Sequence, residues 1–112
     1  MAYDEALAER VRELLADLAD PAEVREQRMF GGVAFMVRGN MCCGVHGSEL
    51  IARLSPDDAE DALGDPCARP MDMTGRPMRG WLFVGPATDF EDERLDGWLQ
   101  RCLDHCLTLK PK

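Results

Sequence analysis

Hydrophobic and polar residues follow a helical period at the start of this chain. Apolar residues recur at three- and four-residue spacing, and charged residues occupy the positions between them. This is the pattern of an amphipathic helix with one buried face. The apolar positions are Leu7, Val11, Leu14 and Leu18. We predict a helix from about Asp4 to Leu18 that ends at Asp20-Pro21, because proline disfavours the helical conformation of the residue before it.

The next part of the chain has the shorter period of β-strands, and it predicts an antiparallel meander. The tripeptides Arg38-Gly39-Asn40 and His46-Gly47-Ser48 supply tight turns, since Gly and Asn tolerate a positive φ. Gly31 and Gly32 would permit a bend at a point where a side chain would clash. The predicted strands are Val24–Met29, Gly32–Val37, Met41–Val45 and Glu49–Leu54. The second strand is apolar on both faces, which is typical of a central strand covered by helices on one side and by loops or a partner on the other.

A second helix is predicted to begin at Ser55, because a serine N-cap followed by proline and two aspartates suits a helix N-terminus. It should stop at Leu63-Gly64. Residues 65–77 are predicted to be extended, with a turn at Thr74-Gly75, and Met78–Val84 has the branched and aromatic composition of a strand.

Thr88 and Glu91 have the spacing of a capping box and predict the start of a last helix there. Its apolar stripe is Leu95, Trp98, Leu99, Cys102, Leu103, Cys106 and Leu107. The predicted fold class is therefore α+β, an antiparallel sheet with helices packed against it in the order α-β(3–4)-α-β(2)-α.

The size and charge of the chain narrow its function classes. A chain of 112 residues fits one domain, 1–112, which can bury a sizeable core. Its net charge of -8 opposes direct binding to nucleic acid, which depends on Lys and Arg contacts to phosphate. The acidic N-terminus does not resemble a signal peptide, and the apolar runs are too short to span a membrane. We expect a cytoplasmic protein without a membrane partner.

The five cysteines predict neither a disulfide framework nor a cysteine-rich zinc site, because their number is odd and none forms a Cys-x-x-Cys pair. Most are expected to be free, buried thiols. Cys42 and Cys43 are adjacent on a predicted strand and should point to opposite faces. A less favoured interpretation gives four residues a metal-binding role. These residues are His46, Cys102, His105 and Cys106. No cofactor is predicted.

Arginine and aromatic residues of the predicted sheet are the candidates for binding a partner. Guanidinium groups beside an exposed indole can bind a carboxylate, a phosphate or a partner's aromatic side chain. The competing interpretation buries Trp81 under the last helix and pairs the arginines with acidic side chains. The candidate residues are Arg28, Phe30, Arg76, Arg79 and Trp81. No catalytic set is predicted, since the two histidines and two serines accompany no Gly-x-Ser-x-Gly motif.

Two segments together resemble a known family. They are Arg28-Met29-Phe30-Gly31-Gly32, which continues as an apolar strand to the turn and Met41, and Gly75-Arg76-Pro77-Met78-Arg79-Gly80-Trp81. The chain resembles the N-terminal domain of the TfoX/Sxy family, bacterial proteins linked to regulation of natural competence. The resemblance implies an α-β(3)-α-β(2)-α fold similar to that of secretion chaperones. The chain ends at Lys112, without room for the C-terminal domain of the full-length regulators, so only a stand-alone domain is implied.

The resemblance and the residues together favour a non-enzymatic regulatory or adaptor domain that acts by protein–protein interaction. Its partner would be another protein or a second copy of itself, a homodimer included. The alternative is an enzyme that binds a small molecule or a metal, which requires a pocket with convergent polar groups.

Overall fold

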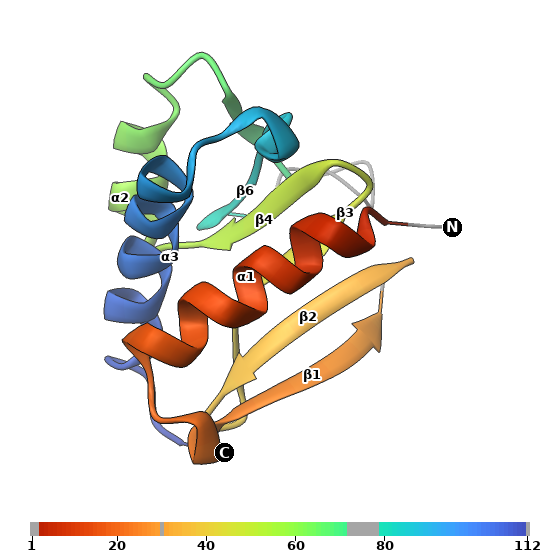
Figure 1. Ribbon diagram of the computed structural model, residues 1–112. Helices are drawn as coiled ribbons and strands as arrows, with labels where there is room; N and C mark the ends of the chain where they lie inside the picture. The colour runs from red at the N-terminus through yellow and green to blue at the C-terminus, as the bar shows by residue number, and fades with distance from the viewer. Residues whose placement is uncertain (1–2, 30, 72–78, 112) are drawn as a thin grey trace.

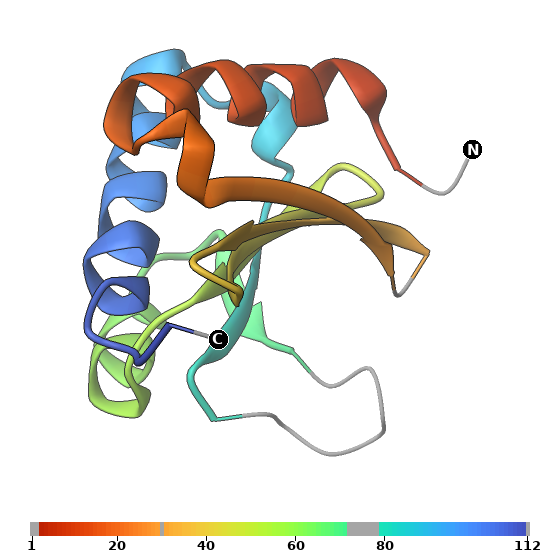
Figure 2. The same ribbon diagram turned by 90° about the horizontal axis from the view of Figure 1, so that it is seen from below.

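The computed structural model describes residues 3–29, 31–71 and 79–111. These residues form one sheet with helices on one of its faces (Figures 1 and 2). The helices are α1 (Glu5–Leu18), α2 (Pro56–Ala62) and α3 (Asp92–Cys106), with 3-10 turns at Pro21–Glu23 and Ala87–Asp89. The strands are β1 (Val24–Met29), β2 (Gly32–Val37), β3 (Asn40–His46), β4 (Glu49–Arg53), β5 (Ala68–Pro70) and β6 (Trp81–Val84).

The strand order in the sheet is β1-β2-β3-β4-β6-β5, and every pair is antiparallel. The first four strands are neighbours in both sequence and space, as the predicted meander requires. β6 lies between β4 and β5, so β5 is an edge strand, and β1 is the edge strand on the other side. This order of elements confirms the predicted α+β class.

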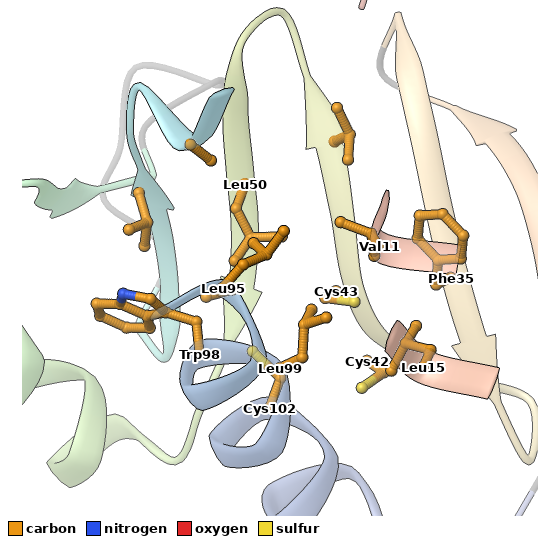
Figure 3. Close-up of a cluster of buried hydrophobic side chains, with 14 of the residues drawn as sticks. Val11, Leu15, Phe35, Cys42, Cys43, Leu50, Leu95, Trp98, Leu99 and Cys102 are labelled. Atoms are coloured by element: carbon orange, nitrogen blue, oxygen red, sulfur yellow. The ribbon is translucent and has the colours of Figure 1, made fainter. Parts of the chain in front are cut away.

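The main core lies between the sheet and its helices. Leu7, Val11 and Leu15 of α1 face Leu99 of α3 and Phe35 of β2, and all are buried. Figure 3 shows Val11, Leu15 and Phe35 among the side chains that fill the space between α1, α3 and the strands. Burial of large aliphatic and aromatic side chains is the main stabilising contribution in a domain of this size.

A smaller apolar cluster lies on the other face of the sheet. Phe83, Ile51 and Ala34 are buried there, and half-buried Met and Trp side chains pack against them. Of the methionines in the cluster, Met41 and Met71 are buried, and Met29 and Met36 are half-buried. Both faces of β2 are therefore apolar, as predicted.

Several predicted boundaries are confirmed. The Asp4 side chain accepts the Leu7 N–H at 2.8 Å and caps α1, and Ser55 caps α2 through the Asp58 N–H at 3.2 Å. β1 and β2 have the predicted ends. The strand predicted from Met78 begins at Trp81, because Arg79 and Gly80 form a turn in which Gly80 has a φ of 88°. Thr74-Gly75 and Met78 lie outside the described residues.

The predicted capping box at Thr88 and Glu91 is wrong. Thr88 lies in a 3-10 turn, and α3 starts at Asp92 with Glu91 as an N-cap that makes no side-chain bond. Contacts with α1 fix this start instead, because Arg10 donates to the Phe90 carbonyl at 2.6 Å and pairs with Asp92 at 2.9 Å. At the other end α3 stops at Cys106, so Leu107 is exposed and does not belong to the buried stripe.

The prediction that Cys42 and Cys43 face opposite ways is also wrong. Phe35 pairs with Cys43 whereas Met36 pairs with Met41, so β3 carries one extra residue, Cys42, at this point. A β-bulge of this kind breaks the alternation of side chains along a strand. Both thiols therefore lie in the main core, fully buried (Figure 3).

No helix in the described part of the chain is long and apolar enough to cross a membrane.

Candidate functional site

A groove of about 240 Å³ opens between α2 and the strand β6. Its α2 wall is formed by Pro56, Ala59 and Leu63, and its sheet wall by Pro70, Trp81 and Leu82. Two charged residues, Glu60 on α2 and Arg79 before β6, also line it. We call these eight residues, together with Gly80, the α2 groove.

The sequence builds this groove through two local features. Ser55 and Pro56 start α2 directly after β4, which places the helix next to the beginning of β6. There the Leu54 N–H donates to the Gly80 carbonyl at 2.7 Å. Gly80 is required at this point, because a Cβ would lie 2.7 Å from the Leu54 carbonyl oxygen and the φ of 88° disfavours other residues. The two walls are therefore held at a fixed separation.

The apolar lining includes a side chain that the fold leaves in solvent. Leu63 is 39 % exposed, and among the described residues only Leu107, at 43 %, is another large exposed hydrophobic side chain. Leu63 is the C-cap residue of α2 and lines the groove. Exposed apolar surface that continues into a concave apolar lining is typical of sites that bind another molecule.

The two charged residues lie on different walls of the groove, Glu60 on α2 and Arg79 at the sheet wall. Arg79 is exposed at the sheet wall, and it forms no ion pair with any residue in the described ranges. Trp81 is half-buried, and the Arg53 guanidinium lies 5.0 Å from the centre of its ring. This cation–π contact holds the indole in place between the groove and the second apolar cluster. The groove can accept an apolar side chain between Leu63 and Trp81 and an anionic group at Arg79.

The structure separates the residues predicted to bind a partner. Arg79 and Trp81 meet in the α2 groove. Arg28 lies on the edge strand β1 at the far side of the sheet, where it faces α1 beside Glu5 and Glu9. Phe30 and Arg76 lie outside the described residues. The competing interpretation of Trp81 does not hold, because this side chain packs on the face opposite α3.

The residues considered for a metal site are also separated. Cys102 and Cys106 point into the main core, whereas His46 lies near Phe83 of the second apolar cluster, with ring centres 5.7 Å apart and ring planes tilted by 44°. His105 is half-buried near Arg53, and burial followed by this charge lowers its pKa. Within the described ranges no three His, Cys, Asp or Glu side chains gather as metal ligands would.

Free thiols instead form part of the core. Burial raises the pKa of the Cys102 thiol, and the neighbouring Cys42 thiol together with burial raises the pKa of Cys106. The Cys106 Sγ lies 3.7 Å from the carbonyl oxygens of Val37 and Asn40, where a protonated thiol can donate. All of the cysteines among the described residues are unbridged, as the sequence predicts.

Sequence reasoning missed the α2 wall of the groove. Leu63 and Pro70 lie in segments that the pattern describes only as a helix end and an extended stretch. Leu63 itself could have indicated the site, because a leucine at the end of a short acidic helix is not easily buried by that helix. Its relation to Trp81 depends on the place of β6 in the sheet, which hydrophobic spacing does not determine.

Comparison with known proteins adds a family. The model of the family described as TfoX N-terminal domain matches residues 13–106. No curated protein and no solved structure matches the chain. The matched residues run from within α1 to the end of α3 and include every strand and the whole α2 groove. The chain therefore belongs to the TfoX N-terminal domain family.

Proposed function

We propose that this protein is a non-enzymatic regulatory or adaptor domain that binds a segment of a partner protein in the α2 groove. The observation that carries the proposal is the exposed Leu63 beside a groove lined by Pro70, Trp81 and Leu82. The family is not known as an enzyme family.

The size of the groove favours a peptide side chain over a small-molecule substrate. Ligand pockets usually have volumes of roughly 300–1,000 Å³ and enclose most of the ligand. The groove has about 240 Å³, enough for one or two apolar side chains. Its rim carries few polar groups, so the specific contacts would come from Arg79 and Glu60.

The charges indicate the chemistry of the partner. We expect an extended segment with one bulky apolar residue as the anchor and an acidic residue next to it that meets Arg79. A basic or neutral residue would lie on the side of Glu60. Apolar anchors usually contribute most of the binding energy of such contacts, while charges at the rim set the orientation.

The test is selection of displayed random peptides against the purified protein, followed by affinity measurements with the enriched peptides. Leu63→Asp should weaken binding at least about tenfold, because truncation of a central anchor typically costs this much. Leu107→Asp is the matched control, since Leu107 is exposed to a similar extent but lies outside the groove. It should bind like the wild type.

A second variant tests the charge. Arg79→Glu should discriminate against the peptides that contain an acidic residue and leave those without one nearly unchanged. Circular dichroism would verify that each variant is folded. The proposal is refuted if no peptides are enriched, or if the enriched peptides bind Leu63→Asp as tightly as the wild type.

A further inference from the structure

The edge strand β1 presents a row of backbone hydrogen-bonding groups to which no strand of the described residues is paired. β1 is the first strand of the sheet, and its residues from Arg25 to Arg28 are all exposed. The Arg38 N–H donates to the Glu23 carbonyl at 3.0 Å and continues the β1–β2 ladder. This bond shows which residues of β1 form hydrogen-bonded pairs with β2. Because residues of an antiparallel strand turn alternately toward each neighbour, Arg25, Gln27 and Met29 bond to β2. The N–H and C=O groups of Glu26 and Arg28 therefore point outward, whereas the Val24 N–H donates to the Pro21 carbonyl.

The side chains of β1 lie alternately on the two faces of the sheet. Glu26 and Arg28 pair with Phe35 and Val33 of β2, which are core residues, so both charges lie on the helix face. The ion pair between Glu26 and Arg12 of α1, at 2.5 Å, agrees with this placement. Arg25 and Gln27 lie on the other face.

We propose that β1 pairs with β1 of a second copy of this chain, antiparallel and around a twofold axis at Gln27, so that two sheets join into one. The proposal is independent of the α2 groove, which lies toward the opposite edge of the sheet.

Charge selects this register among those that the backbone allows. Since the N–H and C=O groups that point outward belong to Glu26 and Arg28, which are two residues apart, the axis must pass through a residue. An axis at Arg25 places two arginines opposite each other, and an axis at Glu26 places two glutamates opposite each other. An axis at Gln27 places Glu26 opposite the partner's Arg28, twice. Directly opposed like charges destabilise a strand pair and opposite charges stabilise it.

Charged side chains on an edge strand usually prevent pairing with unrelated strands. In β1 the alternation of Glu26 and Arg28 opposes most partners and complements a copy of itself. The contact is small, since one six-residue strand from each copy forms it. We therefore expect a weak, reversible dimer with a dissociation constant in the micromolar range or above, as is usual for small interfaces.

Analytical ultracentrifugation of a charge-swap pair tests the register. Arg28→Glu places Glu26 opposite a glutamate in both contacts and should weaken the dimer at least about tenfold. Glu26→Arg should do the same. An equimolar mixture of the two variants restores opposite charges at every contact, so it should form a heterodimer. Loss of folding in either variant would abolish this rescue, so recovery also shows that both are folded.

Crosslinking provides a second readout. Residue 27 would lie in a non-hydrogen-bonded pair with its own copy, at a Cα separation of about 4.5 Å, which a disulfide can span. Gln27→Cys should therefore form a covalent dimer in oxidised glutathione, which accepts the two electrons that the two thiols lose. Arg25→Cys is the matched control, because the two copies of residue 25 would be about 13 Å apart at the usual rise per residue.

The outcomes distinguish the alternatives. A monomer at all concentrations without a Gln27→Cys crosslink overturns the proposal. A dimer that crosslinks through Arg25→Cys, or that Arg28→Glu does not weaken, overturns the register at Gln27.

Discussion

Gly32 provides a sharp test of how closely β2 and β3 approach each other. A Cβ built at this position would lie 2.2 Å from the Val45 carbonyl oxygen, whereas ordinary contact begins at 3.4 Å. The obstructing atom belongs to the backbone of a central strand, so it cannot move aside as the end of a side chain could. Gly32→Ala must therefore either separate the two strands or distort β2.

The cost of such overpacking is typically about 1–3 kcal/mol. In a domain of about this size, each kcal/mol lowers the melting temperature by about 4–8 °C. We expect Gly32→Ala to melt at least about 4 °C below the wild type and to lower the urea midpoint without changing the slope of the transition.

The matched control is Gly97→Ala. Gly97 lies in α3 and is exposed, and a Cβ added to it would meet no atom within 4 Å. Alanine should stabilise this helix by about 0.8–1 kcal/mol, because glycine is the poorer helix former. The same chemical change is thus expected to act in opposite directions at the two sites. A Gly32→Ala variant within about 0.5 kcal/mol of the wild type, well below the usual cost of overpacking, would refute the close approach of β2 and β3.

Three further predictions concern the core and its charges. Leu99→Ala should lower the free energy of unfolding by about 2–5 kcal/mol in urea denaturation, since this fully buried side chain would leave a cavity; a loss below about 1 kcal/mol would contradict the packing. In the native protein an alkylating reagent should modify Cys67, which is half-buried, much faster than the other thiols, and mass spectrometry after unfolding should find all five modified. The hydrogen bond from the Cys67 N–H and the Arg94 guanidinium lower the pKa of Asp65, so its stabilising contribution is complete above the ordinary aspartate value of about 3.9 and is lost as pH falls through the lower native value. The stability difference between the wild type and Asp65→Asn should therefore shrink between about pH 5 and pH 2, and a difference that is constant over this range would contradict the assignment. In the alkylation experiment, the thiols expected to react slowly are the buried ones, Cys42, Cys43, Cys102 and Cys106.

Local sequence patterns predict most of the elements of this fold. α1 and the first two strands have the expected boundaries, because capping residues, proline and apolar periodicity act over a few residues. Gly31 and Gly32 also have the expected role, since Gly31 has a φ of 73° and Gly32 touches the neighbouring backbone.

Long-range contacts explain where the sequence-based expectations were wrong. The start of α3 depends on Arg10, a residue about eighty positions away, so the nearby Thr88 and Glu91 could not reveal it. The faces of Cys42 and Cys43 depend on a bulge opposite Phe35, which has no signature in the residues themselves.

The candidate site shows the same division. Trp81 and Arg79 were identified because their residue types suit binding. Leu63 was not, because its importance depends on α2 lying beside β6.

The place of β6 between β4 and β5 imposes an order on the growth of the sheet. β1 to β4 can pair successively with short loop closures as the chain is synthesised from its N-terminus. β5 precedes β6 in the chain, and β6 is its one partner among the described strands, so β5 has no strand to join until the later residues have arrived. The last edge of the sheet can therefore form only after the residues of β6 have left the ribosome, and the main core is closed only when α3 follows them.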